Sequence, residues 1–140
     1  MQLSNEAKIT GVKETTAGTT EVDSGAIDMQ GYDGVMCVVR VNVNNAGNYL
    51  KAQSDVASGL GTVADIAGSK VVCTGADEFL FIDIYRPQKR YVQFAVIRGA
   101  STATGDMVIL RYSGDKKPEV NATLNALAGV FLQSPADGTA

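Results

Sequence analysis

The stretch that decides the fold class is FLFIDIY, residues 79–85. If this stretch is extended, three aliphatic residues occupy one face and three aromatic residues occupy the other, and a single aspartate interrupts them. β-Branched and aromatic residues are typical of strands, in which successive side chains point to opposite faces. The pattern predicts a strand here and, after a turn at residues 86–89, a second strand at residues 91–98 that forms a hairpin with it.

A further strand is predicted at residues 35–43, where every second residue from Val35 to Val43 is apolar. The side chains on the other face are apolar at the start of the strand and polar at its end. This is typical of a central strand whose far end is no longer covered by another layer of the protein. We expect a turn at residues 44–48 and a first hairpin with residues 49–54. Another strand is expected at residues 107–112.

Short strands about ten residues apart, separated by Gly, Asn and Thr turns, are typical of a β-sandwich or jelly roll. We therefore predict an all-β fold, with a jelly-roll-like domain of two sheets at residues 1–114. Residues 55–70 carry apolar spacing that Gly59 and Gly61 interrupt, so a broken helix and a loop are both compatible with this segment. A loop there would lie at the surface or contact a neighbour.

The last part of the sequence, residues 115–140, differs in character and is predicted to be a C-terminal arm. It begins with a polar break that contains Pro118. Apolar residues then recur at spacings of four, three and four, which places them on one face of a helix: Val120, Leu124, Leu127 and Phe131. We expect this face to be buried, either against the domain's own core or sheet edge or against a neighbouring subunit.

Composition excludes most catalytic and nucleic-acid-binding classes. The 140 residues include no histidine, and the formal net charge is −3. Histidine is the commonest general base and a frequent zinc ligand, and nucleic-acid binding requires clustered positive charge. We expect no enzyme activity, cofactor, metal or nucleic-acid partner. We also expect no membrane association, because the sequence lacks both a signal-peptide pattern and an apolar stretch of about twenty residues.

The acidic residues do not form a recognisable reaction centre. Asp23, Asp28 and Asp33 do not match the ligand spacing of a calcium loop, and we expect them to cap turns. Asp77 and Glu78 are adjacent, so in an extended segment their side chains point to opposite faces and do not share a proton.

The two cysteines, Cys37 and Cys73, both stand in apolar surroundings. A small buried hydrophobic side chain serves such positions well, and one bridge at most is available. We therefore expect two reduced structural thiols, which suits assembly in a reducing cytoplasm.

Aromatic and arginine residues flank the predicted turn in the segment YRPQKRY, residues 85–91. Arginine pairs bidentately with carboxylates, tyrosine offers a rigid contact surface, and both are enriched at the centres of protein interfaces. The alternative is a polar hairpin tip whose tyrosines cover the core. With the arm, this segment supplies the candidate interface residues: Tyr85, Arg86, Arg90, Tyr91, Val120, Leu124, Leu127 and Phe131.

Three blocks of the sequence resemble the capsid cement or decoration proteins, small proteins encoded beside the major capsid proteins of tailed bacteriophages. The blocks are IDMQGYDGV at residues 27–35, DIYRPQKRYV at residues 83–92 and SPADGTA at residues 134–140. The resemblance implies a β-rich, non-enzymatic virion protein that is made in the bacterial cytoplasm and binds the outside of the icosahedral head. Its partner would be the major capsid protein, and its role would be to reinforce contacts between capsomers.

The oligomeric state and an alternative function are also considered. Self-association into dimers or trimers is expected, because symmetric sites on a shell suit symmetric oligomers. The alternative function is that of a tail or fibre β-sandwich that recognises a host-surface glycan. Sugar sites usually present exposed aromatic residues with converging polar groups, and this chain has no Trp and only 5 Tyr. A small hydrolase that uses carboxylates ranks last.

Overall fold

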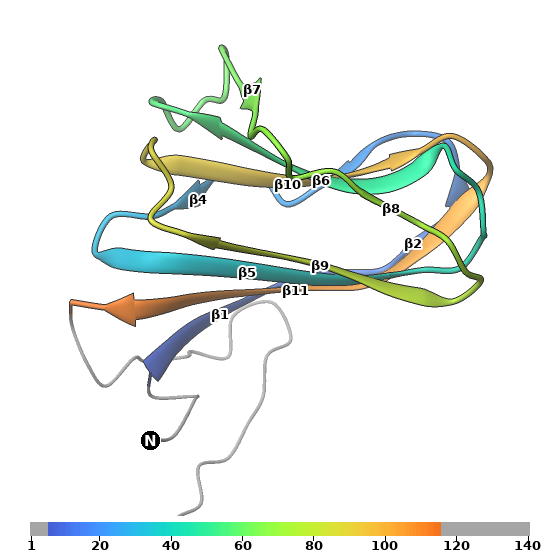
Figure 1. The fold of residues 1–140 in the computed structure, drawn as a ribbon, viewed down its shortest axis with the longest axis horizontal. Coiled ribbons are helices and arrows are strands. Elements are labelled where there is room, and N and C mark those ends of the chain that lie inside the picture. Colours follow the sequence, from blue (N-terminus) through green and yellow to red (C-terminus); the bar gives the residue numbers. More distant parts are fainter. Residues whose placement is uncertain (1–5, 116–140) are drawn as a thin grey trace, which may run out of the picture.

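The structure is a computed structural model that describes residues 6–115 of the chain. These residues form two antiparallel sheets that pack against each other, which confirms the predicted all-β sandwich (Figure 1). Apart from Asp115, the predicted arm lies outside the described residues, and so do all four of its apolar positions: Val120, Leu124, Leu127 and Phe131.

Five strands form the first sheet, which is the lower layer in Figure 1. Its spatial order is β1 (Ala7–Val12), β11 (Thr102–Gly114), β5 (Tyr32–Val41) and β9 (Glu78–Tyr85), and β2 (Thr15–Gly18) also pairs with β11. Six strands form the second sheet. Its order is β3 (Val22–Asp23), β10 (Tyr91–Arg98), β6 (Asn48–Asp55) and β7 (Ala64–Asp65), while β4 (Ile27–Asp28) pairs with β10 and β8 (Val71–Val72) pairs with β6.

The core lies between the two sheets and is built from the alternating apolar faces that the sequence contains. The predicted apolar face of β5 is confirmed at Val35, Cys37, Val39 and Val41, which are all at most 1% exposed. Val43, which was predicted to continue it, lies after the end of the strand and is half-buried. The largest fully buried side chain is Phe94, on β10 of the second sheet. Burial of apolar surface on this scale is the main favourable term in folding.

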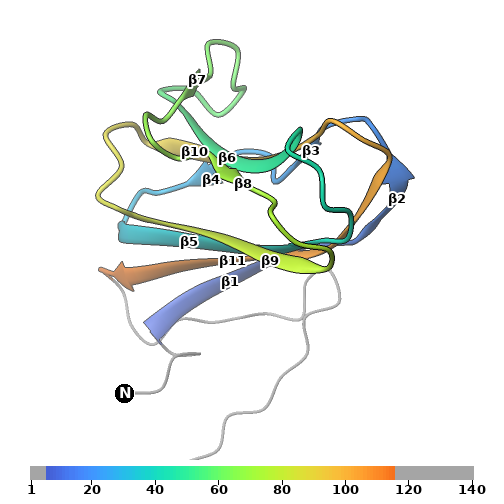
Figure 2. The ribbon, with the colours of Figure 1, turned by 45° about the vertical axis from the view of Figure 1, so that its right-hand side comes forward.

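Both predicted hairpins are wrong. β5 pairs with β11 and β9, while β6 belongs to the other sheet and pairs with β10, β7 and β8. In the same way, β9 and β10 lie in different sheets, as Figure 2 shows. Each connection therefore crosses from one sheet to the other. The physical reason is that a crossover lets both connected strands bury an apolar face on one shared core, and neither connection carries the two-residue Asn-Gly or Asp-Gly turn of a tight hairpin.

Other boundaries also differ from expectation. The strand predicted at residues 35–43 spans Tyr32–Val41. β11 is longer than the predicted strand and begins at Thr102, because Thr104 already pairs with Val41 before a bulge. Residues 55–70 contain no helix and form a loop that includes β7. The fully buried carboxylate of Asp55 organises the start of this loop.

The Asp55 carboxylate accepts several hydrogen bonds from the loop that follows it. The N–H groups of Thr62, Val56 and Ala57 donate to it at 2.8, 2.6 and 3.2 Å, and the Thr62 hydroxyl donates at 3.1 Å. These donors, with the Thr62 N–H first, lower the pKa of Asp55 below its usual value. The charge thus replaces the regular backbone pairing that the glycine-rich segment lacks.

The structure confirms that Cys37 and Cys73 are free and buried. Burial raises the pKa of Cys37 to about 12 and also raises the pKa of Cys73. Because the thiolate is the reactive form, we expect Cys37 to resist iodoacetamide in the native protein at about pH 8 and to react once the chain is unfolded. Mass spectrometry of labelled protein measures this, and rapid native labelling of Cys37 would contradict the burial.

Candidate protein-interaction surface

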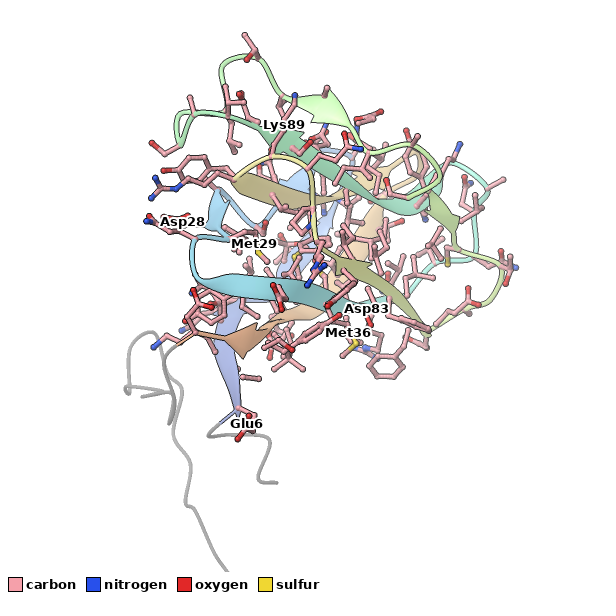
Figure 3. The ribbon with its side chains drawn as sticks, turned by 60° about the vertical axis from the view of Figure 1, so that its left-hand side comes forward. Glu6, Asp28, Met29, Met36, Asp83 and Lys89 are labelled. Atoms are coloured by element: carbon pink, nitrogen blue, oxygen red, sulfur yellow. The ribbon has the colours of Figure 1, made fainter. Side chains whose placement is uncertain are left out.

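The crossover from β9 to β10 lies at one end of the sandwich, beside the turn that joins β4 to β5. Two backbone hydrogen bonds hold the segments together: Met29 N–H donates to the Arg90 carbonyl at 2.8 Å, and Arg86 N–H donates to the Asp33 carbonyl at 2.6 Å. Asp28, Met29 and Lys89 from these segments are labelled in Figure 3. The fold therefore joins two segments that are more than fifty residues apart in the sequence.

The candidate residues Tyr85, Arg86, Arg90 and Tyr91 gather at this end, and we call them the tip cluster. Arg90 has a carboxylate partner in its own chain, because its Nε and Nη2 donate to the two carboxylate oxygens of Asp28 at 2.9 and 2.8 Å. Its guanidinium also lies 5.1 Å from the centre of the Tyr91 ring. The predicted bidentate pairing thus exists, but it is intramolecular and fixes the shape of the tip.

Arg86 is the more available arginine of the tip cluster. It is exposed, it adopts a positive φ of 52°, and its guanidinium lies 5.2 Å from the centre of the Tyr85 ring. Tyr85 is 60% exposed, so it does not cover the core, whereas Tyr91 is half-buried. Within residues 6–115, no carboxylate forms an ion pair with Arg86. An exposed arginine stacked on an exposed tyrosine is a typical anchor for a protein partner.

An open depression of about 580 Å³ lies between the two segments of the tip. The crossover contributes residues 86–90, and the β4–β5 turn contributes Met29, Gln30, Tyr32 and Asp33. Since Asp28 neutralises Arg90, the remaining charges at this depression are those of Arg86, Lys89 and Asp33, which sum to a net positive charge. This charge pattern suits an acidic segment of another protein.

The sequence interpretation missed a second surface, the outward side of the first sheet. We define this outer face by Val38, Phe79, Phe81 and Val108, of which Phe79 is 68% and Phe81 is 63% exposed. Val38 lies between Phe81 and Val108 in the register of β9, β5 and β11. The apolar alternation on both sides of residues 79–85 was the available signal. Only the packing of the two sheets shows which side of β9 faces away from the core.

Polar contacts close the outer face at one end. Tyr112 lies over Gly34, where a Cβ would collide with its ring, and its hydroxyl donates to the Asp83 carboxylate at 2.7 Å. Burial and the hydrogen bond to Asp83 raise the pKa of Tyr112 to about 12. The glycine thus allows a tyrosine from β11 to reach across β5 to β9, as aromatic side chains do over glycines in other sheets.

The remaining acidic candidates have structural roles. Asp23 accepts the N–H of Gly25 and Asp28 accepts the N–H of Gln30, which confirms turn capping for these two. Asp77 pairs with Arg40 at 3.2 Å, and Glu78 accepts hydrogen bonds from residues 74 and 75. In the described part of the chain, no group of three or more acidic or cysteine side chains is placed to hold a metal ion. Residues 6–115 also contain no helix with the length and apolar character needed to cross a bilayer.

The pair formed by Asp28 and Arg90 gives the tip a measurable pH dependence. The hydrogen bond from Arg90 and the N–H of Gln30 lower the pKa of Asp28 from 3.8 to about 2. A lowered folded-state pKa stabilises the fold above the ordinary pKa, and this contribution disappears as pH falls through the folded value. We expect the melting temperature of Asp28→Asn to lie slightly below that of the parent at about pH 5, since the pair is half exposed.

This difference should shrink as the pH approaches about 2, because the parent carboxylate is then protonated too. Thermal unfolding followed by circular dichroism at several pH values measures it. A difference that stays constant over this range would show that the charge of Asp28 does not stabilise the tip.

Comparison with known proteins finds weak similarity to three solved structures. No protein family and no curated protein matches the chain. The SPBc2 prophage-derived protein YomS is similar with a TM-score of 0.45 and 12% identity, over 74% of this chain and 94% of that one. A Bacillus endospore appendage protein, from a family of disulfide-linked pili, is similar with a TM-score of 0.38 and 17% identity, over 80% of this chain and 95% of that one. A chain of infectious bursal disease virus, Gx strain, is similar with a TM-score of 0.33 and 12% identity, over 82% of this chain and 32% of that one. All three TM-scores are below 0.5, so the function has to be argued from the chain's own residues.

Proposed function

We propose that this chain is a decoration protein of a tailed-bacteriophage head that binds the outer surface of the shell, stabilises contacts between capsomers and catalyses no reaction. The observation that supports this most is the composition of the tip. Residues 27–35 and 83–92 are two of the blocks that resemble decoration proteins. The fold brings both blocks to the same depression, through the contacts of Arg90 with Asp28 and Met29.

The chemistry of the tip suits binding. Arg86 and Tyr85 offer an exposed cation and an exposed ring, and the pairing of Arg90 with Asp28 holds the surrounding backbone in place. A surface organised before binding loses less conformational freedom when its partner arrives. The partner we propose is an acidic patch of the major capsid protein, and the protein would bind it as a dimer or trimer on the outside of the virion.

The mechanism is mass action on a lattice. Each copy contributes a standard interface, on the order of 1,600 Å² in total. A subunit or small oligomer that contacts two capsomers makes its second contact intramolecular, which raises the effective concentration of that contact. Preferential binding to the assembled shell over separated capsomers stabilises the assembly by linkage and needs no cofactor.

Co-sedimentation tests this function. The purified protein is mixed either with phage shells that lack it or with the separated capsomers. Shells are then pelleted and capsomers are separated by gel filtration, and the bound and free amounts of the protein are measured. We expect saturable binding to shells and much weaker binding to capsomers. No binding to shells, together with specific signals on a glycan array, would favour the tail or fibre module instead.

A further inference from the structure

We infer that the outer face of the first sheet is the docking site for the chain's own residues 120–131, the apolar part of the C-terminal arm. This apolar segment begins a few residues after β11, a central strand of the same sheet. This docking involves contacts within one chain and is independent of the proposed function.

The outer face is a continuous apolar band across three strands. Val108, Val38 and Phe81 lie side by side on β11, β5 and β9, and Leu110 lies beside Met36 in the next row. Phe79 extends the band along β9, next to Arg40. Two neighbouring phenylalanines that are more than 60% exposed form a large apolar patch, and such patches on soluble proteins mark interaction sites.

Polar groups limit the band at both ends. The hydrogen bond between Tyr112 and Asp83 lies at the end where β11 finishes, and the ion pair of Arg40 with Asp77 lies at the other end. Figure 3 labels Met36 and Asp83, which mark the border between the apolar band and the first polar group. From the row of Met36 and Leu110 to the row of Phe79 the band is about 13 Å long, at roughly 3.3 Å per strand residue.

The arm begins at the correct end of this band. Asp115 N–H donates to the Gly31 carbonyl at 2.9 Å, so the chain leaves β11 beside the row of Tyr112 and Gly34. The four residues 116–119 can span about 14 Å. The distance across the sheet from β11 to β9 is about 10 Å. The linker is therefore long enough to place residue 120 over any strand of the band.

The dimensions and chemistry of the arm also match the band. As a helix, residues 120–131 would be about 18 Å long, which is enough to cover the whole length of the band. Their spacing puts Val120, Leu124, Leu127 and Phe131 on one side. A four-residue linker gives an effective concentration on the order of millimolar. This favours docking within one chain over docking onto a second copy at micromolar concentration.

Disulfide trapping in the full chain tests the inference. We expect the Phe81→Cys, Leu127→Cys variant to form an intrachain disulfide under mild oxidation, seen as a faster monomer band and a linked peptide pair in mass spectrometry. The matched control joins Leu127→Cys to Val56→Cys, because Val56 is 71% exposed outside the outer face, and it should remain largely reduced. The buried thiols of Cys37 and Cys73 are poor competitors.

A second pair, Val108→Cys with Leu124→Cys, repeats the test without removing an aromatic side chain from the band. A disulfide-linked dimer from both pairs would overturn the inference in favour of docking onto a second copy. Trapping no better than in the Val56 control would also overturn it, because the arm would then lie elsewhere.

Hydrogen exchange tests the same docking without introducing any new cysteine. We expect the amides of residues 120–131 to be protected in the parent protein, and the Phe79→Ser, Phe81→Ser variant to lose about tenfold or more of this protection. Both side chains are exposed, so the sandwich should remain folded. Val56→Ser should leave the protection unchanged. An arm that is unprotected in the parent, or whose protection ignores the double substitution, contradicts the inference.

Discussion

Replacing Arg98 with methionine is expected to lower the free energy of unfolding by about 2–4 kcal/mol, since it removes the donor from one buried and two part-buried carbonyls. Arg98 is only 8% exposed. Its Nη1 donates to the carbonyls of Thr16 and Thr102 at 2.9 and 2.8 Å, and its Nε donates to the carbonyl of Thr20. The guanidinium on β10 of the second sheet therefore holds the segment around β2 of the first sheet.

Urea unfolding measures this effect, and Arg40→Met is the matched control. Arg40 is also paired, with Asp77, but it is exposed, so its replacement should cost less than about 1 kcal/mol. Arg98→Lys keeps the charge without the planar fork and should lie between the parent and Arg98→Met. An Arg98→Met protein as stable as the Arg40→Met control would show that these hydrogen bonds do not support the fold.

The Arg86→Ala, Arg90→Ala double variant is expected to bind phage shells on the order of 100-fold more weakly than the parent, which is typical of losing anchor residues from an interface. The two substitutions act differently. Arg86→Ala removes the cation stacked on Tyr85 and leaves the backbone of the tip intact. Arg90→Ala breaks the pair with Asp28 and loosens the turn beside the depression.

The control must remove the same charge elsewhere. Lys13→Ala, Lys70→Ala also removes two exposed positive charges, and both lysines lie outside the tip depression. This variant should bind shells nearly as the parent does at physiological salt, where distant surface charges are largely screened. Titration of shells, with circular dichroism to verify folding, separates the outcomes. Equal binding by the folded double variant and the control would remove the tip from the interface.

The sequence was sufficient to predict the fold class and the faces of the strands, but not their partners. The alternation at residues 35–43 predicted which side of β5 is buried, because a side chain's face depends only on its position in the strand. Pairing depends on long-range competition among strands with similar apolar faces. For this reason, the predicted pairing of residues 79–85 with residues 91–98 was wrong, and the true neighbour of β9 is β5.

The candidate site was predictable in composition and only partly in geometry. Residue types alone identified the Tyr85 to Tyr91 segment, because arginine and tyrosine have recognisable roles in interfaces. The ion pair between Arg90 and Asp28 joins residues that are 62 positions apart, so no local sequence pattern could predict it. The outer face was missed because both sides of residues 79–85 are apolar. Phe79 and Phe81 are exposed because the second sheet packs against the other side of β9, which carries Leu80 and Ile82.

The most direct test of the central claim is the number of copies of this chain in purified virions of a tailed phage that encodes it. Quantitative mass spectrometry measures this number relative to the major capsid protein. A protein that occupies repeated sites on an icosahedral lattice should be present on the order of hundreds of copies. Absence from the virion, or only a few copies as for a tail component, would contradict the account.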